Sequence, residues 1–429
     1  MREKNDPALL SIHSPYSFDE SVSLPLEPLL DEVRNQLVNT GYSESALTQT
    51  DLVINRLRKI ASEQNTTEYT IDLRNKLLED CQYPSGGGFS GFRYREHRLL
   101  IHRIDSYIAN GKIDFSPIKK HNDYLITKQA AFVEAYNTYQ KSIEHLSKSA
   151  KRLYCRSVGY FLNYLDFEKG YTTLCELKNG DISTYIPKAA SEHFPNSLSN
   201  MLTGLRGFLS LEELGIDYSF LMEIPTKIAK PRRIIDPLSN DELQQITDTL
   251  DDVENDIPLR DRAITEVAIG TGYRSIDILG LTFSSFDWEN DTLTIIQHKT
   301  GRSLNYPLTA SIGNAVVDYL LHERPDSESD YIFLQMQAPY LPLTSNFSSR
   351  DILRKVFEKA NIDLRERPVG TRLTRHSRAT YLLSKGVPLA LIAQSLGHRN
   401  NSTVNVYLST DEEHLADCIL PLPIKQEVQ

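Results

Sequence analysis

Apolar residues three or four positions apart recur along most of the chain, and this spacing predicts amphipathic helices. One block of such segments runs from about residue 26 to 110, and a second runs from about 127 to 221. Residues 1–25 are polar and rich in serine and proline, which predicts a flexible tail. We therefore expect a helical N-terminal accessory domain at 26–120 and a second helical domain at 127–221.

A change of pattern marks the entry to a third domain. The stretch "MEIPTKIAKPRRIIDPLSNDE" contains spaced prolines and several basic residues, and it ends in Ser239 with Glu242 three positions later. Serine followed at that spacing by glutamate is typical of a capping box at a helix start. We interpret residues 222–238 as a linker and residues 239–429 as the third domain.

The third domain mixes two periods. Its segment "DTLTIIQHKTGRSLNYPLT" contains two alternating runs around Lys-Thr-Gly-Arg, which predicts a β-hairpin, while the other segments have helical spacing. The predicted fold class is mainly α with a small antiparallel β-sheet (α+β) in this C-terminal domain, preceded by two helical domains.

The net charge of −10 argues mildly against a nucleic-acid partner, but the charge is unevenly distributed. Residues 239–257 hold seven acids and no base, whereas residues 365–378 hold five arginines and one glutamate. In a helix, Arg372, Arg375 and His376 would share one face. Since like charges converge only at a cost, an anion is expected to bind there.

Cysteine use and hydropathy bear on the compartment. The four cysteines are widely scattered and form no CxxC motif, which favours free thiols in a reducing compartment: Cys81, Cys155, Cys175 and Cys418. The N-terminus lacks the apolar core of a secretory signal, and no apolar run approaches the roughly 18 residues of a membrane span. We expect a cytoplasmic protein.

Four motifs follow one another in the third domain. Arg274 comes directly after "GTGY", Lys299 lies at the predicted hairpin tip, Arg375 lies in "RLTRHSR", and His398 in "LGHRNN" precedes Tyr407 by nine residues. This set resembles the catalytic domain of the tyrosine recombinases, the phage integrase family. The resemblance covers roughly the last 190 residues, with Asp277 where the family usually has glutamate, and it extends more loosely to a core-binding domain at 127–221.

The resemblance assigns catalytic roles to Arg274, Lys299, Arg375, His398 and Tyr407. One position departs from the family pattern, because Arg372 stands where a histidine is usual. Arginine stays protonated in proteins, so it can bind phosphate but cannot act as a general base. His398 is the candidate to accept the proton of the nucleophile, and His376 is the weaker one.

The chemistry of these side chains suits a phosphodiester. Arginine binds two non-bridging oxygens with its planar fork, and such cations favour the phenolate of a tyrosine whose free pKa is about 10. A lysine at the hairpin tip can protonate the departing 5′ oxygen. The product would be a 3′-phosphotyrosyl bond. No metal or nucleotide cofactor is then required, and the GxGxxG at Gly86, Gly88 and Gly91 follows a helical segment rather than a strand, which favours a turn.

The resemblance thus implies a site-specific DNA recombinase, an integrase or transposon recombinase of a mobile element. It would bind double-stranded DNA at specific sites, as a homotetramer in the synaptic complex, with a possible accessory factor and no membrane association. Two alternatives stay open. One is a catalytically impaired DNA-binding or architectural protein on the same scaffold, and the other is a type IB topoisomerase, which shares the chemistry.

Overall fold

The computed structural model describes residues 23–81, 88–116, 124–226, 235–299, 301–343, 346–365 and 367–397, with single positions 118 and 228. Those within 117–232 form one compact unit, and the others form a second. Buried apolar side chains gather in separate cores within 26–113, 132–224 and 235–373. The domain boundaries expected from the sequence stay a prediction.

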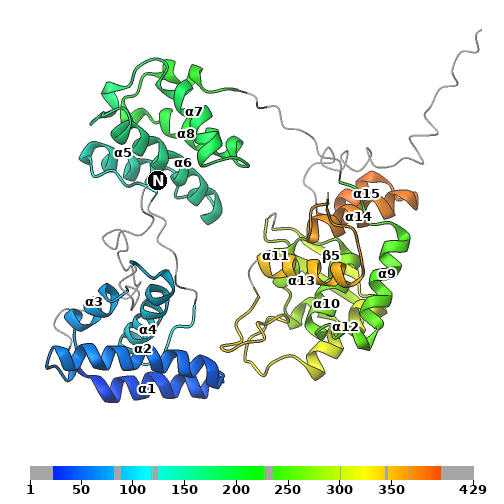
Figure 1. The fold of residues 1–429 in the computed structure, drawn as a ribbon. Coiled ribbons are helices and arrows are strands. Elements are labelled where there is room, and N and C mark those ends of the chain that lie inside the picture. The colour runs from blue at the N-terminus through cyan, green and yellow to red at the C-terminus, as the bar shows by residue number, and fades with distance from the viewer. Residues whose placement is uncertain are drawn as a thin grey trace, which may run out of the picture. The chain divides into compact units, whose positions relative to one another are not determined.

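The N-terminal part is helical, as its periodicity predicts (Figure 1). Its helices are α1 Leu26–Asn39, α2 Glu44–Glu63, α3 Ile71–Glu79 and α4 Gly91–Asn110. Serine or threonine side chains cap α2, α3 and α4, each accepting a hydrogen bond from a backbone N–H of the first turn. Two short antiparallel strands, β1 Leu24–Pro25 and β2 Glu68–Tyr69, were not expected from the sequence.

The unit within 117–232 is an all-helical bundle in the part that the structure describes. Its α-helices are α5 Ala130–Ser142, α6 Lys148–Phe167, α7 Asp181–Glu192 and α8 Leu198–Leu209. Helix α6 packs against α8 at Gly204, where a Cβ would lie 3.0 Å from the Tyr154 Cα atom. The absence of a side chain at this position lets the two helices approach closely.

The C-terminal part joins helices to a small sheet. Its helices are α9 Asn240–Asp251, α10 Leu259–Thr271, α11 Ser275–Leu279, α12 Ala310–His322, α13 Asn346–Lys359, α14 Thr371–Ser384 and α15 Leu389–Ser395. Helix α10 packs against α12, α13 and α14, and its residues Ala263, Ile264 and Val267 are fully buried. Helices α14 and α15 lie side by side (Figure 1).

The predicted hairpin is present. Strand β4 Thr292–Ile296 pairs antiparallel with β5 Ser303–Pro307, and Leu293 lies opposite Tyr306. A third short strand, β3 Phe286–Asp287, pairs with β4 and was not expected. The mainly helical fold with a small antiparallel sheet in the C-terminal part is therefore confirmed.

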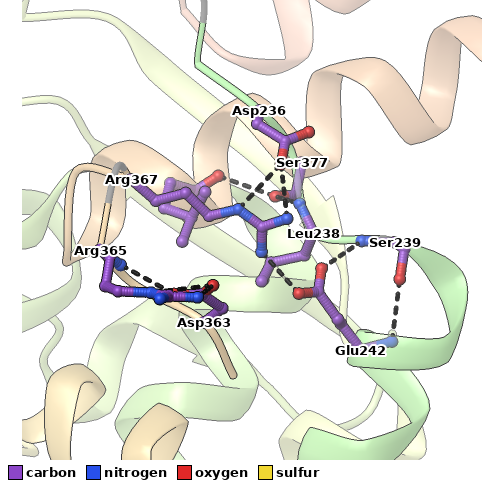
Figure 2. A network of polar contacts seen from close by, with 9 residues as sticks. Asp236, Leu238, Ser239, Glu242, Asp363, Arg365, Arg367 and Ser377 are labelled. Atoms are coloured by element: carbon purple, nitrogen blue, oxygen red, sulfur yellow. Dashed lines mark hydrogen bonds and ion pairs between the residues drawn. The ribbon is translucent and has the colours of Figure 1, made fainter. Parts of the chain in front are cut away.

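The predicted capping box is also present at the start of α9. The Ser239 Oγ atom accepts from the Glu242 N–H at 3.1 Å, and the Glu242 carboxylate accepts from the Ser239 N–H at 2.8 Å. Figure 2 shows that the same carboxylate also receives a hydrogen bond from Arg367, at 2.6 Å. The cap therefore links the start of α9 to the segment that leads into α14.

Candidate active site

Helix α14 carries the arginine motif. It begins after Gly370, whose φ of 111° lies in the region that favours glycine. Arg372 in its first turn is exposed, whereas Arg375 and His376 are only 7% and 9% exposed. Because α14 is a helix, these positions, three and four apart, share a face as expected, but the side chains differ in depth.

This environment lowers the pKa of His376. Burial lowers it most, and the cations Arg372 and Arg375 lower it further, to about 4. The imidazole is therefore neutral at pH 7. Its low pKa also makes it a weak proton acceptor.

Arg375 joins the ends of two other helices. Its Nη1 atom donates to the Gly272 carbonyl at 3.1 Å, and its Nη2 atom donates to the Leu396 carbonyl at 2.6 Å. Gly272 is the C-cap of α10 and Leu396 is the C-cap of α15, where carbonyls lack partners within their own helices. One buried guanidinium thus fixes two chain segments that lie far from it in sequence.

Those two segments lead to other predicted site residues. Gly272 precedes Arg274 by two positions, and Leu396 precedes His398 by two positions. His398 and Tyr407 themselves lie outside the described residues. The structure therefore brings together Arg375, the turn before Arg274 and the residues that lead into His398.

Arg274 is the N-cap residue of α11 and is half-buried. Its Nη1 atom lies 3.8 Å from the Asp277 Oδ2 atom, which makes an ion pair that is too long for a hydrogen bond. Among the described residues, neither of these two buried atoms has a hydrogen-bond partner. The Arg274 side chain is nevertheless 27% exposed, so the exposed part of its guanidinium can donate to an incoming anion.

Lys299 lies in the turn between β4 and β5 and is exposed. The turn is closed by the Gln297 N–H, which donates to the Arg302 carbonyl, and by the Gly301 N–H, which donates to the Gln297 carbonyl, both at 2.8 Å. The backbone N–H of His298 donates to the Asp277 Oδ1 atom at 3.0 Å. Asp277 thus connects the Arg274 helix with the residue next to Lys299.

Gln297 is a residue of this site that sequence reasoning missed. It is fully buried, and its Nε2 atom donates to the Leu396 carbonyl at 3.1 Å. A signal existed in the hairpin, because Leu293 and Ile295 alternate inward and Gln297 continues that inward series as a polar residue. A polar side chain in an inward series indicates a specific partner.

Cofactor sites and membrane spans can be judged only for the described part of the chain. Within it, no three or more histidine, cysteine, aspartate and glutamate side chains are grouped so as to hold a metal ion. None of its helices combines the length and the apolar character needed to cross a membrane.

Comparisons with known proteins identify relatives of this chain. The phage integrase family model matches residues 237–414. A Sinorhizobium fredii protein named "Putative integrase/recombinase y4rA" is 27% identical over 359 residues, covering 81% of each chain. A second protein of that organism, "Putative integrase/recombinase y4gC", is 33% identical over 165 residues, which cover 38% of this chain and 84% of the relative.

This chain belongs to the phage integrase family, the tyrosine recombinases. It is accordingly an enzyme that breaks and rejoins DNA strands at specific sites. Its fold is similar to that of the XerH site-specific recombinase, solved bound to its palindromic difH substrate after cleavage. That similarity has a TM-score of 0.53 at 16% identity, over 93% of this chain and 97% of the other.

Proposed function

We propose that this tyrosine recombinase cuts DNA by attack of Tyr407 on the scissile phosphate. The Tyr407 oxygen forms a bond to phosphorus while the bond to the 5′ oxygen breaks, which leaves a 3′-phosphotyrosyl link and a free 5′ hydroxyl. Attack of a 5′ hydroxyl on that link reverses the step and rejoins the strands. The energy of the phosphodiester bond is kept throughout.

Arg274 and Arg375 bind the non-bridging oxygens in this proposal, and Lys299 protonates the departing 5′ oxygen. The observation that carries the proposal is the pair of bonds from Arg375 to the Gly272 and Leu396 carbonyls. They align the turn before Arg274 with the residues before His398. A preorganised cationic site of this kind stabilises the charge of a transferring phosphoryl group without reorganisation during the reaction.

The proton of Tyr407 needs an acceptor, and Arg372 cannot serve. The pKa of His376 is lowered to about 4 by its burial and by the cations beside it, so its basicity is low. We assign the acceptor role to His398. Arg372, which is exposed at the start of α14, binds phosphate in this scheme.

The biological setting is proposed on family grounds. The extra domain ahead of the core-binding domain favours an integrase or transposon recombinase of a mobile element, acting in the cytoplasm. A homotetramer on two double-stranded sites would carry out the strand exchange, with or without an accessory protein. The DNA that flanks the gene would nominate the site, since repeats there mark the ends of a mobile element.

Covalent trapping on a nicked duplex tests the proposed chemistry. The wild-type protein should form a protein–DNA adduct that survives denaturation, because the nick lets the 5′ fragment diffuse away. Tyr407→Phe should form none while binding DNA as wild type does, and Tyr331→Phe, at an exposed tyrosine of the same part, should behave as wild type. An adduct with Tyr407→Phe would place the nucleophile elsewhere.

The alternative of a catalytically impaired DNA-binding or architectural protein rests only on the arginine at position 372. A wild-type protein that binds the duplex and never forms the adduct would establish an architectural protein. Adduct formation together with relaxation of a closed supercoiled plasmid that carries no specific site would instead establish a type IB topoisomerase.

A further inference from the structure

The carbonyl of Leu396 receives two side chains from different parts of the fold. Arg375 from α14 donates to it at 2.6 Å, and Gln297 from the end of the hairpin donates to it at 3.1 Å. A backbone carbonyl has two lone pairs, so both acceptor positions are occupied. The orientation of this carbonyl is therefore fixed from two directions.

The fit around Gln297 is close. Gly397, with φ of 64°, lies against it so tightly that a Cβ at position 397 would overlap the Gln297 side-chain amide. The amide lies at the end of an inward series whose preceding members, Leu293 and Ile295, are apolar. A buried amide in that setting is destabilising unless its hydrogen bonds are made. Gln297 therefore specifies one alignment of the hairpin relative to α15. An apolar side chain at this position would not specify that alignment.

The positions of the neighbouring residues give this alignment a function. Lys299 follows Gln297 by two residues, and His398 follows Leu396 by two residues. Resting on the function proposed above, we propose that Gln297 is a positioning residue that holds the Lys299 hairpin in register with the segment leading into His398. It touches neither the phosphate nor the leaving oxygen and acts through these two side chains.

Gln297→Met tests this role because methionine keeps the length of the side chain and removes the donor. The matched control is Asn305→Ala, which removes the hydrogen bond between Thr294 and Asn305, an exposed contact of the same hairpin that does not reach α15. Gln297→Leu also lacks the donor and brings no charge into this buried position, so it replaces the methionine variant if that variant does not fold.

The first measurement is single-turnover cleavage of a nicked duplex with either an oxygen or a sulfur at the 5′ bridging position. Gln297→Met should lower cleavage of the oxygen substrate roughly 10–100-fold, the order of loss from misplaced catalytic groups. A thiolate leaves without protonation, since a thiol pKa is only about 8.5. The loss should therefore be several-fold smaller on the sulfur substrate, because it no longer needs Lys299.

A purely structural role would lower both rates equally, and that result would overturn the proposal. Cleavage of the oxygen substrate within twofold of wild type would overturn it too, as would an equal loss with Asn305→Ala. DNA affinity should stay within twofold in all variants.

The second measurement does not depend on activity. Amide hydrogen exchange of the free full-length protein should become at least tenfold faster for the peptide covering residues 389–397 in Gln297→Met, and stay unchanged in Asn305→Ala. If the wild-type protein does not cleave, the proposed function fails, and the exchange result still decides whether Gln297 holds this segment. An unchanged exchange rate of this peptide in Gln297→Met would show that Gln297 does not hold the segment, and would overturn the proposal.

Discussion

Arg367, in the segment before α14, and Arg375, within α14, are close in the sequence, but the groups that they contact differ in charge. Arg367 donates to the carboxylates of Asp236 and Glu242 at 2.6 Å each (Figure 2). Burial alone would lower the pKa of Arg367, but its hydrogen bonds to the Glu242 and Asp236 carboxylates outweigh burial and raise that pKa. The positive charge of Arg367 is thus balanced by carboxylates of the same chain.

Arg375 donates to the neutral carbonyls of Gly272 and Leu396, and such bonds orient a guanidinium without cancelling its charge. A second cation, Arg372, lies near enough to contribute to the lowered pKa of His376. The first arrangement stabilises the fold, and we propose that the second orients Arg375 toward an anion. The contrast separates arginines that serve structure from those proposed to serve chemistry.

The largest expected effect is on cleavage. Arg375→Ala should lower the single-turnover rate by about a hundredfold or more, the usual cost of losing one contact to the transition-state charge, and Arg274→Ala should do the same. Arg367→Ala should leave the rate nearly unchanged at a temperature where all variants are folded, since its charge is already balanced. Equal losses for Arg367→Ala and Arg375→Ala would remove the distinction between the two sites.

The pH dependence of stability sharpens the comparison. The pKa of His376 is lowered to about 4 in the folded protein, whereas an unfolded histidine titrates near 6.5. Between these values the unfolded state binds more protons, so stability falls as the pH drops from about 6.5 to 4. His376→Gln should remove up to about 3 kcal/mol of this decline, measured by urea unfolding across pH. An identical decline in both proteins would show that the pKa of His376 is not lowered in the folded protein.

Loss of Arg367 should instead appear as loss of stability. Arg367→Ala leaves Glu242 partly buried without its main partner, and we expect a decrease of about 1–3 kcal/mol in the free energy of unfolding. Asp236 is 72% exposed, so Asp236→Asn should cost less. Arg365→Ala is the matched control, because Arg365 pairs only with the exposed Asp363 among the described residues, and stability should not change measurably. A larger effect from Arg365→Ala would contradict this assignment.

The sequence predicted the local features of the fold but not its long-range hydrogen bonds. Alternation predicted the hairpin, and the Ser239–Glu242 spacing predicted the capping box, because both depend on neighbours in the chain. The short strand β3 and the five-residue helix α11 carry too few residues to show a period. Counting five arginines in 365–378 also overstated the free charge, since the carboxylates that balance Arg367 come from more than 120 residues away.

The candidate site shows the same limit. Helical spacing placed Arg372, Arg375 and His376 on one face, but only the packed fold shows that Arg372 is exposed while the others are buried. The bonds from Arg375 to Gly272 and from Gln297 to Leu396 span 103 and 99 residues. The residue types at those positions do not reveal which carbonyls the side chains contact, because tertiary packing determines these partners.

The smallest expected effect concerns Arg372. It lies in the first turn of α14, where the helix dipole favours an anion and disfavours a cation, so its side chain adds little to helix stability there. If it binds phosphate in place of a histidine, Arg372→Lys should keep activity within about tenfold, with the loss due to the missing bidentate fork. Single-turnover cleavage of the nicked duplex across pH measures this.

Arg372→His separates a working arginine from a lost active site. In an active enzyme, histidine should be tolerated and should add a rate dependence near pH 6.5, because the new side chain titrates there. An inert wild-type protein with an active Arg372→His variant would show that the arginine marks lost catalysis. The difference between Arg367 and Arg375 would then bear on DNA binding and not on cleavage. A wild type faster than both variants would show that the bidentate guanidinium at this exposed position, beside the buried Arg375, contributes to the reaction. We expect the wild type to cleave, because the bonds that align Arg375, the turn before Arg274 and the hairpin are all in place.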